Sequence, residues 1–252
     1  MPDILDKPGG LCYNYFPMDH NGEINRIKAE YNRRDSDARL SGLYDRLNPA
    51  VIHIRHEIER HLAHFFNGGK RTAGAPGESK LIDIGCGGGA FFNMFAQLGF
   101  KPESLFGAEL SYERIKAAAG GVRGGMTNAD AASLPFRDSC FDYASQFTVF
   151  SSVIDKGLRT KIASEMKRVV KNGGYIISYD MLHTNPFNAN LAPLKYAHFT
   201  ELFGARPEAC YRIVLNPIIL RRLIERFGLV CDIFSSIKVL NSFYLAFIRV
   251  EK

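Results

Sequence analysis

The chain has 252 residues, of which 46% are hydrophobic and 23% are charged, and this composition excludes a disordered chain, a collagen and a disulfide-rich mini-protein. The 32 basic and 26 acidic side chains leave a net charge of +6, which permits an anionic partner without requiring one. The length fits one domain with an added segment.

The first predicted element is an amphipathic helix that begins at Asn48, the expected N-cap, with Pro49 at the first helical position. Its apolar residues recur at three- and four-residue steps: Val51, Ile54, Ile58, Leu62 and Phe65. Residues 23–47 are polar and are expected to be partly helical. Residues 67–79 are rich in glycine and form a predicted linker. The chain therefore divides into an N-terminal helical lid, residues 1–67, and a second domain, residues 80–252.

Strands and helices alternate in the second domain. Strands are predicted over residues 80–85, 104–110, 141–149 and 175–181, with a weak strand before Asp130, and helices over residues 90–98, 112–119 and 155–171. After an irregular stretch, residues 183–198, a strand is expected at 209–215, a helix from Asn216 to Phe227 that Gly228 ends, and a final strand at 243–250. This alternation predicts an α/β fold: a Rossmann-like, mostly parallel seven-stranded sheet with helices on both faces.

The most informative segment is a glycine turn that follows the first strand, Asp83-Ile84-Gly85-Cys86-Gly87-Gly88-Gly89. Glycines permit a positive φ and let a ligand approach the main chain closely, and a helix N-terminus offers unpaired N–H groups. The segment fits both a dinucleotide pattern, G-x-G-x-x-A from Gly85, and the pattern D-x-G-x-G-x-G from Asp83. Asp83 favours the second pattern, because a carboxylate repels a pyrophosphate but attracts the ammonium group of a methionine moiety.

Four further motifs follow in order. They are Phe106-Gly107-Ala108-Glu109, residues 128–136 around Asp130, Phe141-Asp142-Tyr143 leading to Gln146, and Arg168-Val169-Val170-Lys171-Asn172-Gly173-Gly174. With the glycine turn, these motifs resemble those of class I S-adenosylmethionine-dependent methyltransferases, over residues 80–180 by motif and to residue 250 by element order. Asn172 departs from that family, which usually has Pro before the two glycines.

The resemblance implies that S-adenosylmethionine is the cofactor and assigns its contacts. Its methionine part lies against the glycine turn, its ribose hydroxyls bind at the end of the second strand, and its adenine amine meets the third motif. The cofactor-binding residues are then Asp83, Gly85, Cys86, Gly87, Glu109, Leu110, Asp130, Ala131 and Gln146. Tyr13, Tyr15, Phe16 and Tyr31 either pack within the lid or close over the sulfonium.

Two alternatives stay open. Glu109 lies 24 residues after Gly85, close to the spacing of a dehydrogenase ribose ligand, so an NAD(P)-dependent oxidoreductase on a related sheet is the first. The second is a non-catalytic binding module that keeps the cofactor fold. The Asp130 motif and the strand-rich tail favour the methyltransferase.

The acceptor is indicated only by exclusion and position. Gln146-Phe147-Thr148-Val149 replaces the [D/N]-P-P-[F/Y] of base-amine methyltransferases, and no basic run exceeds two residues, so no nucleic-acid partner is expected. A small-molecule, glycan-like or lipid-linked acceptor methylated at oxygen fits better, as in the stand-alone bacterial methyltransferases of polysaccharide or secondary-metabolite pathways that the chain loosely resembles. His183 and Asp180, which follow the fifth strand, are the predicted catalytic groups, with His183 as the general base.

No metal is expected. Four histidines lie in the first helix, but the metalloprotease pattern H-E-x-x-H that begins at His56 fails at Arg60, so a solvated face of His53, His61 and His64 is predicted. The five cysteines form no C-x-x-C pair and their number is odd, which indicates a reducing compartment. The sequence shows no signal peptide and no apolar run that approaches a membrane span, so a cytoplasmic protein is expected.

Overall fold

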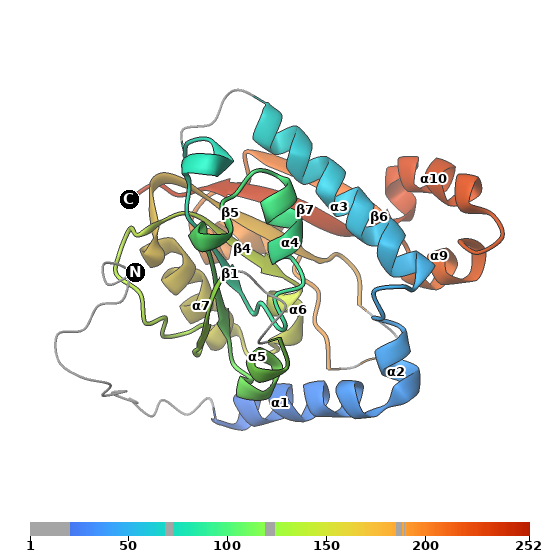
Figure 1. Ribbon diagram of the computed structural model, residues 1–252, viewed down its shortest axis with the longest axis horizontal. Coiled ribbons are helices and arrows are strands. Elements are labelled where there is room, and N and C mark those ends of the chain that lie inside the picture. The colour runs from blue at the N-terminus through green and yellow to red at the C-terminus, as the bar shows by residue number, and fades with distance from the viewer. Residues whose placement is uncertain (1–20, 69–72, 119–123, 185–187, 189) are drawn as a thin grey trace.

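The computed structural model describes residues 21–252 except 69–72, 119–123, 185–187 and 189. Seven strands form one sheet (Figure 1), and their order is β3-β2-β1-β4-β5-β7-β6. The strands are β1 (Leu81–Ile84), β2 (Leu105–Glu109), β3 (Gly125–Asn128), β4 (Phe141–Phe147), β5 (Val170–Met181), β6 (Ala209–Leu215) and β7 (Asn241–Arg249). Neighbouring strands from β3 to β5 are parallel, whereas β7 is antiparallel to both β5 and β6. The expected α/β, mostly parallel, seven-stranded fold is confirmed.

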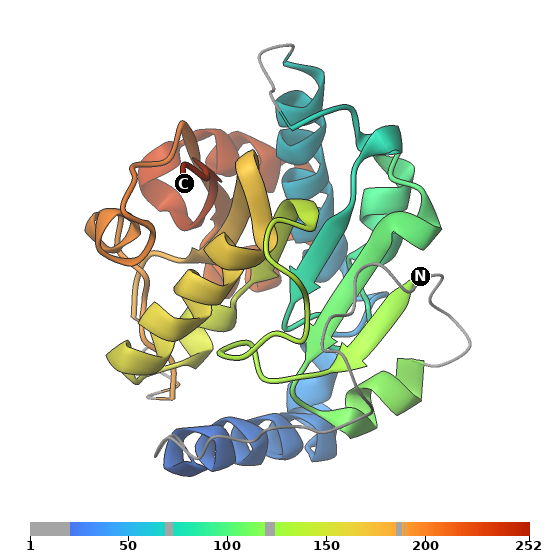
Figure 2. The same cartoon turned by 90° about the vertical axis from the view of Figure 1, so that its left-hand side faces the viewer.

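Two hydrophobic cores lie on opposite faces of the sheet, because alternate residues of each strand point to opposite sides. Ile82 and Ile84 of β1 join the first core, and Leu81 joins the second. The first core is covered by α1 (Asn21–Ser36), α6 (Val149–Ser152), α7 (Lys156–Val169) and α8 (Ala197–Phe203), and the second by α3 (Pro49–Asn67) and α4 (Phe92–Gln97). Figure 2 shows the molecule from the left-hand side of Figure 1, with α7 in front of the sheet.

Helix α3 begins as the sequence predicts. The side chain of Asn48 accepts a hydrogen bond from the Ala50 N–H, and Pro49 is the first helical residue. Ile58 and Leu62 of α3 are buried in the same core as β1 and β5. The division of the chain into two parts at residues 67–80 stays a prediction. Helix α3, which precedes this division, packs against the sheet that follows it.

The predicted histidine face of α3 is wrong. Only His56 and His64 are exposed. The ring of His61 lies 4.8 Å from the ring of Tyr211 on β6, and burial lowers the pKa of His61 to about 4. His53 Nε2 lies 3.3 Å from the Ser235 hydroxyl. The error arose because a helix that packs against a sheet on one side and against other helices on its flank has two buried faces.

Several element boundaries also differ from the sequence prediction. Val149 begins α6 instead of ending β4, and α7 ends at Val169, so the Gly173-Gly174 pair lies inside β5. The expected irregular stretch and the residues after it contain α8. The helix expected from Asn216 to Phe227 is the shorter α9 (Pro217–Leu223), and Gly228, expected to end it, begins a helix that the sequence did not predict, α10 (Gly228–Ser236). The remaining helices are α2 (Ala38–Gly42) and α5 (Tyr112–Ala118).

Candidate functional site

The glycine turn between β1 and α4 has the backbone conformation that glycine permits. Gly85, Gly87 and Gly89 have φ values of 67°, 55° and 70°. The N–H groups of Gly85 and Cys86 donate to the carbonyl oxygen of Ala108 at 2.8 and 3.3 Å, which fixes the turn against β2. A Cβ atom at Gly85 would lie 2.5 Å from Val149 Cγ2, so any other residue there collides with the start of α6.

Glu109, the last residue of β2, links the glycine turn to the β2–α5 turn. One carboxylate oxygen accepts a hydrogen bond from the Gly87 N–H and the other accepts from the Ser111 N–H, both at 2.8 Å. Glu109 is only 4% exposed. Because the backbone of two loops holds it, this carboxylate has a fixed orientation, and each oxygen keeps a second lone pair for a ligand hydroxyl.

A cavity of about 60 Å³ lies at the carboxyl ends of β1 and β2 and the loop after β3. It brings together five of the predicted cofactor-binding residues, namely Gly85, Glu109, Leu110, Asp130 and Ala131. Asp130 is held by the Ala132 N–H, which donates to its Oδ1 at 2.9 Å. The cavity therefore has a carboxylate at each of two neighbouring strand ends, where ligands of open α/β sheets bind.

Helix α1 forms one wall of this cavity through Ile24, Ile27 and Tyr31. We call α1 the lid helix. The predicted cofactor contacts did not include its two isoleucines, although their spacing with Tyr31, at i, i+3 and i+7, is that of one helix face. Tyr13, Tyr15 and Phe16 lie outside the described residues.

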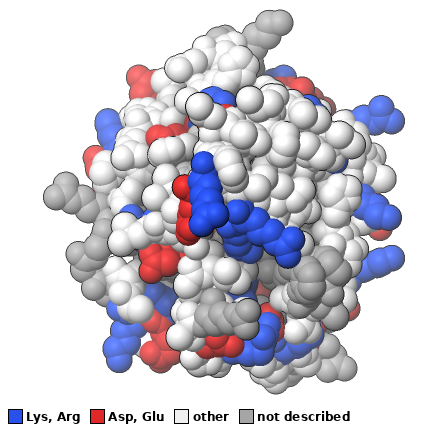
Figure 3. All heavy atoms as spheres, turned by 90° about the vertical axis from the view of Figure 1, so that its right-hand side faces the viewer, with Lys and Arg blue, Asp and Glu red and all other residues white. Residues whose placement is uncertain are grey.

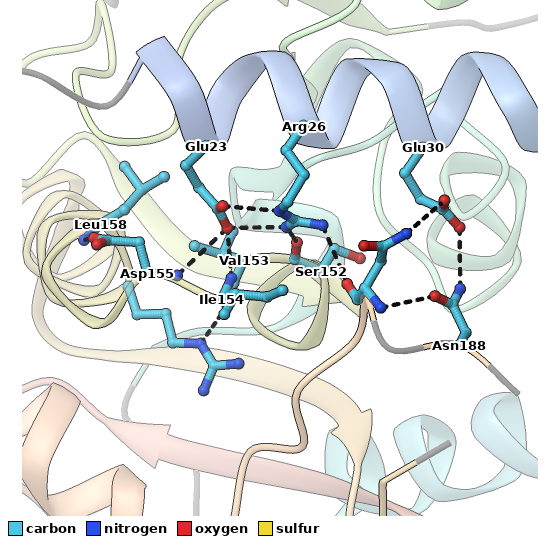
Figure 4. Close-up of polar contacts among 11 residues, drawn as sticks. Glu23, Arg26, Glu30, Ser152, Val153, Ile154, Asp155, Leu158 and Asn188 are labelled. Atoms are coloured by element: carbon cyan, nitrogen blue, oxygen red, sulfur yellow. Dashed lines mark hydrogen bonds and ion pairs between the residues drawn. The ribbon is translucent and has the colours of Figure 1, made fainter. Parts of the chain in front are cut away.

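Polar contacts fasten the lid helix at two places (Figure 4). Near its N-terminus, Glu23 pairs with Arg26 at 2.8 Å and accepts from the Ile154 N–H at 2.6 Å, while Arg26 Nη2 donates to the Ser152 carbonyl oxygen at 2.6 Å. One turn later, Glu30 accepts from Asn188 and Asn190 at 3.0 and 3.1 Å. Hydrogen bonds from Arg33 and these amides hold the pKa of Glu30 at about 2, against the effect of burial.

With the lid helix in this position, the cavity is too small for a nucleoside-sized ligand, since sites for such molecules measure roughly 300–1,000 Å³. The contacts that fasten the lid are side-chain pairs and loop carbonyls at its surface, whereas the opposite wall is the sheet itself. We therefore expect the lid helix to move when a ligand enters.

A second, open pocket of about 420 Å³ lies on the other side of the glycine turn. Gly88, Gly89 and Asn93 line it together with the cations Arg46 and Arg114. Arg114 forms an ion pair with Asp35 of the lid helix at 3.0 Å, and its guanidinium carbon lies 4.1 Å from the centre of the Tyr31 ring. A guanidinium in this position, beside the glycine turn, is able to bind the carboxylate of a ligand. Nothing in the spacing of the sequence marked Arg114, because the contact depends on how α1 crosses α5.

Three other predicted cofactor residues lie next to the cavity without lining it. Asp83 is 1% exposed and accepts a hydrogen bond from the Ser145 hydroxyl at 2.7 Å; burial raises its pKa to about 7. Gln146 is fully buried, accepts from the Val149 N–H at 2.8 Å and donates to the Ser178 hydroxyl at 2.6 Å. The Cys86 thiol is buried, and burial raises its pKa. Gly87 faces away from the cavity toward Arg114.

The two predicted catalytic residues lie apart from this cavity. Asp180 is fully buried, and its two oxygens accept from the N–H groups of Ser151 and Met181 at 3.1 and 2.9 Å. Burial raises its pKa to about 6. His183 is exposed beyond the end of β5, where its Nε2 lies 3.4 Å from Arg212 Nη2. In the part of the chain that the structure describes, no cluster of three His, Cys, Asp or Glu side chains is placed to hold a metal ion.

Comparison with known proteins finds a matching domain in part of the chain. Residues 82–178 match the family described as a methyltransferase domain. The Caenorhabditis elegans protein named sterol 4-C-methyltransferase strm-1 is 32% identical over 131 residues, which are 50% of this chain and 38% of that protein. The Arabidopsis thaliana 2-phytyl-1,4-beta-naphthoquinone methyltransferase is 25% identical over 170 residues, 63% of this chain and 61% of its own. The first curated relatives are matched over only 24–45% of their own length.

Among solved structures, the N-methyltransferase NodS from Bradyrhizobium japonicum WM9, in complex with S-adenosyl-L-homocysteine, superposes with a TM-score of 0.62. The alignment covers 90% of this chain and all of that chain at 12% identity, a likeness that shows the fold. The sheet order, the glycine turn with Glu109, and the matched domain agree with one another. The chain therefore contains a methyltransferase domain over residues 82–178, on the fold of a methyltransferase solved with S-adenosyl-L-homocysteine.

Proposed function

We propose that this protein transfers the methyl group of S-adenosylmethionine to a small-molecule acceptor, and that the acceptor is lipid-linked or similarly apolar. The observation that carries the proposal is the arrangement of Glu109. Its carboxylate is fixed by the Gly87 and Ser111 N–H groups and lines one cavity with Gly85 and Asp130. A ribose diol needs two acceptors at one point, and an adenine amine needs one more nearby.

The strand order supports this proposal over a nicotinamide-dependent oxidoreductase. The dinucleotide fold has the parallel order 3-2-1-4-5-6, with no reversed strand. Here β7 lies between β5 and β6 and runs antiparallel to both.

The residues present fit S-adenosylmethionine part by part. Glu109 would accept from the ribose hydroxyls and Asp130 from the adenine amine. Gly85 lets the ligand approach the main chain, since no side chain there is compatible with Val149. Arg114 is placed for the methionine carboxylate, with its Nη1 4.0 Å from where a Cβ atom at Gly87 would lie. When bound, the cofactor supplies an electrophilic methyl group on a sulfonium, and the protein must position the acceptor and exclude water.

An aromatic row at the ends of β4, β5 and β7 favours an apolar acceptor. Phe91 stacks on Phe147 with ring centres 3.6 Å apart, and Tyr179 stacks on Phe243 at 5.1 Å. Thr148, which follows Phe147, has a φ of 62°, a strained conformation of the kind found at functional turns. Relatives named for sterol and naphthoquinone methylation point toward acceptors of the same character.

The proposed acceptor atom is oxygen, with His183 as the general base. His183 lies on the loop that leaves β5, at the edge of the sheet where the acceptor arrives. Asp180 is less suited to this task, because a base must reach the hydroxyl that it deprotonates. Both oxygens of Asp180 hold backbone N–H groups at the start of α6 and the end of β5, so we propose that Asp180 positions α6.

Isothermal titration calorimetry with S-adenosylmethionine, S-adenosylhomocysteine and NAD tests the cofactor. Binding of the first two without NAD is expected, and binding of NAD alone would refute the proposal. Formation of S-adenosylhomocysteine in the presence of sterol, quinone and polyprenyl-linked hydroxyl compounds then tests turnover. Cofactor binding without turnover on any acceptor would favour a binding module.

The base is tested with His183→Ala. If His183 accepts the hydroxyl proton, turnover falls by about 10²–10⁴-fold while cofactor affinity is unchanged. A variant with the turnover and the pH profile of the parent protein would assign the step to positioning alone. His198→Ala, which removes a histidine from α8, is the matched control.

A further inference from the structure

The helices between β6 and β7 carry an unusual number of exposed apolar side chains. Among the described residues, thirteen large hydrophobic side chains are exposed, and seven of them lie between Pro217 and Leu240. Leu229 is 81% exposed, Val239 74%, Ile233 61% and Phe227 52%. Single exposed apolar residues are normal on a soluble protein, but a cluster of this size marks an interaction surface.

The cluster has the geometry of an amphipathic helix that faces outward. Leu229 and Ile233 lie one turn apart on α10 and are both exposed, so they form an outward stripe, and the exposed Ile237 follows the last residue of the helix. The opposite side of α10 holds Cys231 and Ser235, which are buried against the protein. The stripe therefore contributes nothing to the described core and is available to a partner.

Basic side chains accompany the stripe. Arg222 lies in the last turn of α9, and Arg226 follows four residues later, after the helix has ended. Lys238 lies between Ile237 and Val239. All three basic side chains are exposed. Between Pro217 and Leu240 there are four basic and two acidic residues. Figure 3 shows this side of the molecule, with a group of basic side chains bordered by a broad uncharged area.

Apolar side chains flanked by Arg and Lys fit the interface of an anionic lipid bilayer, where the apolar groups enter the acyl boundary and the cations meet phosphate headgroups. No described helix is both long and apolar enough to cross a bilayer. The contact we infer therefore lies in the plane of the membrane surface.

The position of the surface agrees with the acceptor that we propose. β6 runs parallel to β5, so its end at Leu215, from which α9 departs, is at the same edge of the sheet as Thr148 and Met181. A bilayer that contacts α9 and α10 is thus adjacent to the edge where methyl transfer takes place.

We propose that the surface formed by Phe227, Leu229, Ile233, Ile237 and Val239, with Arg222, Arg226 and Lys238, docks the protein on anionic phospholipid membranes and presents the active-site edge to a lipid-linked acceptor. The second part of this inference rests on the proposed function. The first part, membrane docking, does not depend on it.

Co-sedimentation of the full chain with vesicles tests the docking. The parent is expected to sediment with vesicles that contain phosphatidylglycerol, to do so less at high salt, and to remain in solution with phosphatidylcholine alone. Leu229→Ser combined with Ile233→Ser should weaken the binding by about tenfold or more. Arg222→Gln combined with Arg226→Gln should remove most of the preference for the anionic lipid.

Tyr196→Ser is the matched control, because Tyr196 is 49% exposed just before α8, outside this surface; the vesicle binding of this variant should equal that of the parent. A parent that does not sediment with phosphatidylglycerol vesicles, or a Leu229/Ile233 variant that binds like the parent, overturns the proposal. So does a parent that is a dimer in sedimentation velocity and becomes monomeric in that variant, since the surface is then a contact between copies of the chain.

Calorimetry with S-adenosylhomocysteine on every variant separates this proposal from the previous one. The substituted side chains are exposed, so their replacement leaves the cofactor site intact. Normal S-adenosylhomocysteine affinity without vesicle binding would refute docking and leave the methyltransferase proposal standing. Vesicle binding without S-adenosylhomocysteine affinity would refute the methyltransferase proposal and leave membrane docking standing.

Discussion

Around the ends of β1 and β2, carboxylates are buried and held by backbone N–H groups, whereas around the ends of β6 and β7 the chain exposes apolar helices. Glu109, at the first place, is 4% exposed and bonded to two loops, while Leu229, at the second, is 81% exposed. The part of the edge that we propose binds the cofactor is thus polar and held by hydrogen bonds, and the part that we propose receives the acceptor is apolar and exposed. A common cofactor needs one geometry, but an acceptor surface is free to differ between proteins that share the fold.

The largest effect is expected from Gly85→Val, which tests whether the cofactor part tolerates any change of shape. The new side chain would collide with Val149 in a backbone conformation that valine adopts only with strain. S-adenosylhomocysteine binding should be lost in calorimetry. Gly88→Ala is the control, because the nearest atom to a Cβ there is Ala118 Cβ at 3.8 Å; its affinity should stay within about twofold of the parent's. Parental affinity in Gly85→Val would show that the turn is not a rigid part of the site.

Asp83→Asn measures how much the burial of the ionised Asp83 carboxylate lowers the free energy of unfolding. Burial raises the pKa of Asp83 from 3.8 to about 7. Between these values the unfolded chain loses the proton and the folded chain keeps it, so the free energy of unfolding should fall as pH rises from 4 to 7 and level off above 7. Three pKa units correspond to at most about 4 kcal/mol.

Asparagine has no proton to lose, so Asp83→Asn should be more stable than the parent at pH 8, and the two should converge near pH 4. Urea denaturation at several pH values measures this. A parent whose stability rises steadily from pH 4 to 7, and in which Asp83→Asn has no effect on that slope, would contradict the prediction.

Glu109→Gln tests the ribose contact itself. An amide keeps the size of the side chain but places an N–H group against either Gly87 or Ser111, and it removes the charge that a ribose hydroxyl would meet. The affinity for S-adenosylmethionine should fall by ~1–3 kcal/mol, as is usual for a hydrogen bond to a charged group. Glu113→Gln, on the exposed side of α5, should bind normally. Equal affinities in both variants would place the ribose elsewhere.

The smallest effect is expected at the lid helix. Glu23→Gln weakens the contacts to Arg26 and to the Ile154 N–H without altering the cavity wall. Because we expect the lid helix to move when a ligand enters, S-adenosylhomocysteine should associate and dissociate faster, by about two- to fivefold, with little change in affinity. Stopped-flow fluorescence measures both rates. Lys28→Ala, an exposed change on the same helix, is the control, and unaltered rates in Glu23→Gln would show that these contacts do not limit entry.

Five of the nine predicted cofactor-binding residues line one cavity, because local geometry places them at the same edge of the sheet. A strand followed by Gly85 must turn, and Glu109 follows from the end of the next parallel strand, so both lie at one edge of the sheet. Likewise β6, Ala209–Leu215, has the predicted bounds, because its mostly apolar run is followed directly by Asn216 and Pro217.

The tail was predicted less well because its signals are ambiguous. The pattern after Asn216 predicts one helix that ends at Phe227, and glycine is a common helix terminator, so Gly228 is expected to end it. In the structure Gly228 begins α10. The cavity wall formed by α1 depends on a long-range packing of Ile27 and Tyr31 that no local pattern encodes, although their spacing was visible. The buried environment of His61 depends on contact with Tyr211, 150 residues later.

The position of β7 has a consequence for the order in which the protein is made. β7 follows all the other strands along the chain, yet it lies between β5 and β6 and pairs with both. During synthesis, the edge of β5 that pairs with β7 therefore stays unpaired, and β6 has no partner strand, until residue 249 has left the ribosome. Unpaired edges of this kind are the sites at which strands of different chains join. A nascent chain that stalls before Asn241 would expose two such edges at once, which makes the last strand the step that protects this protein from aggregation while it is being made.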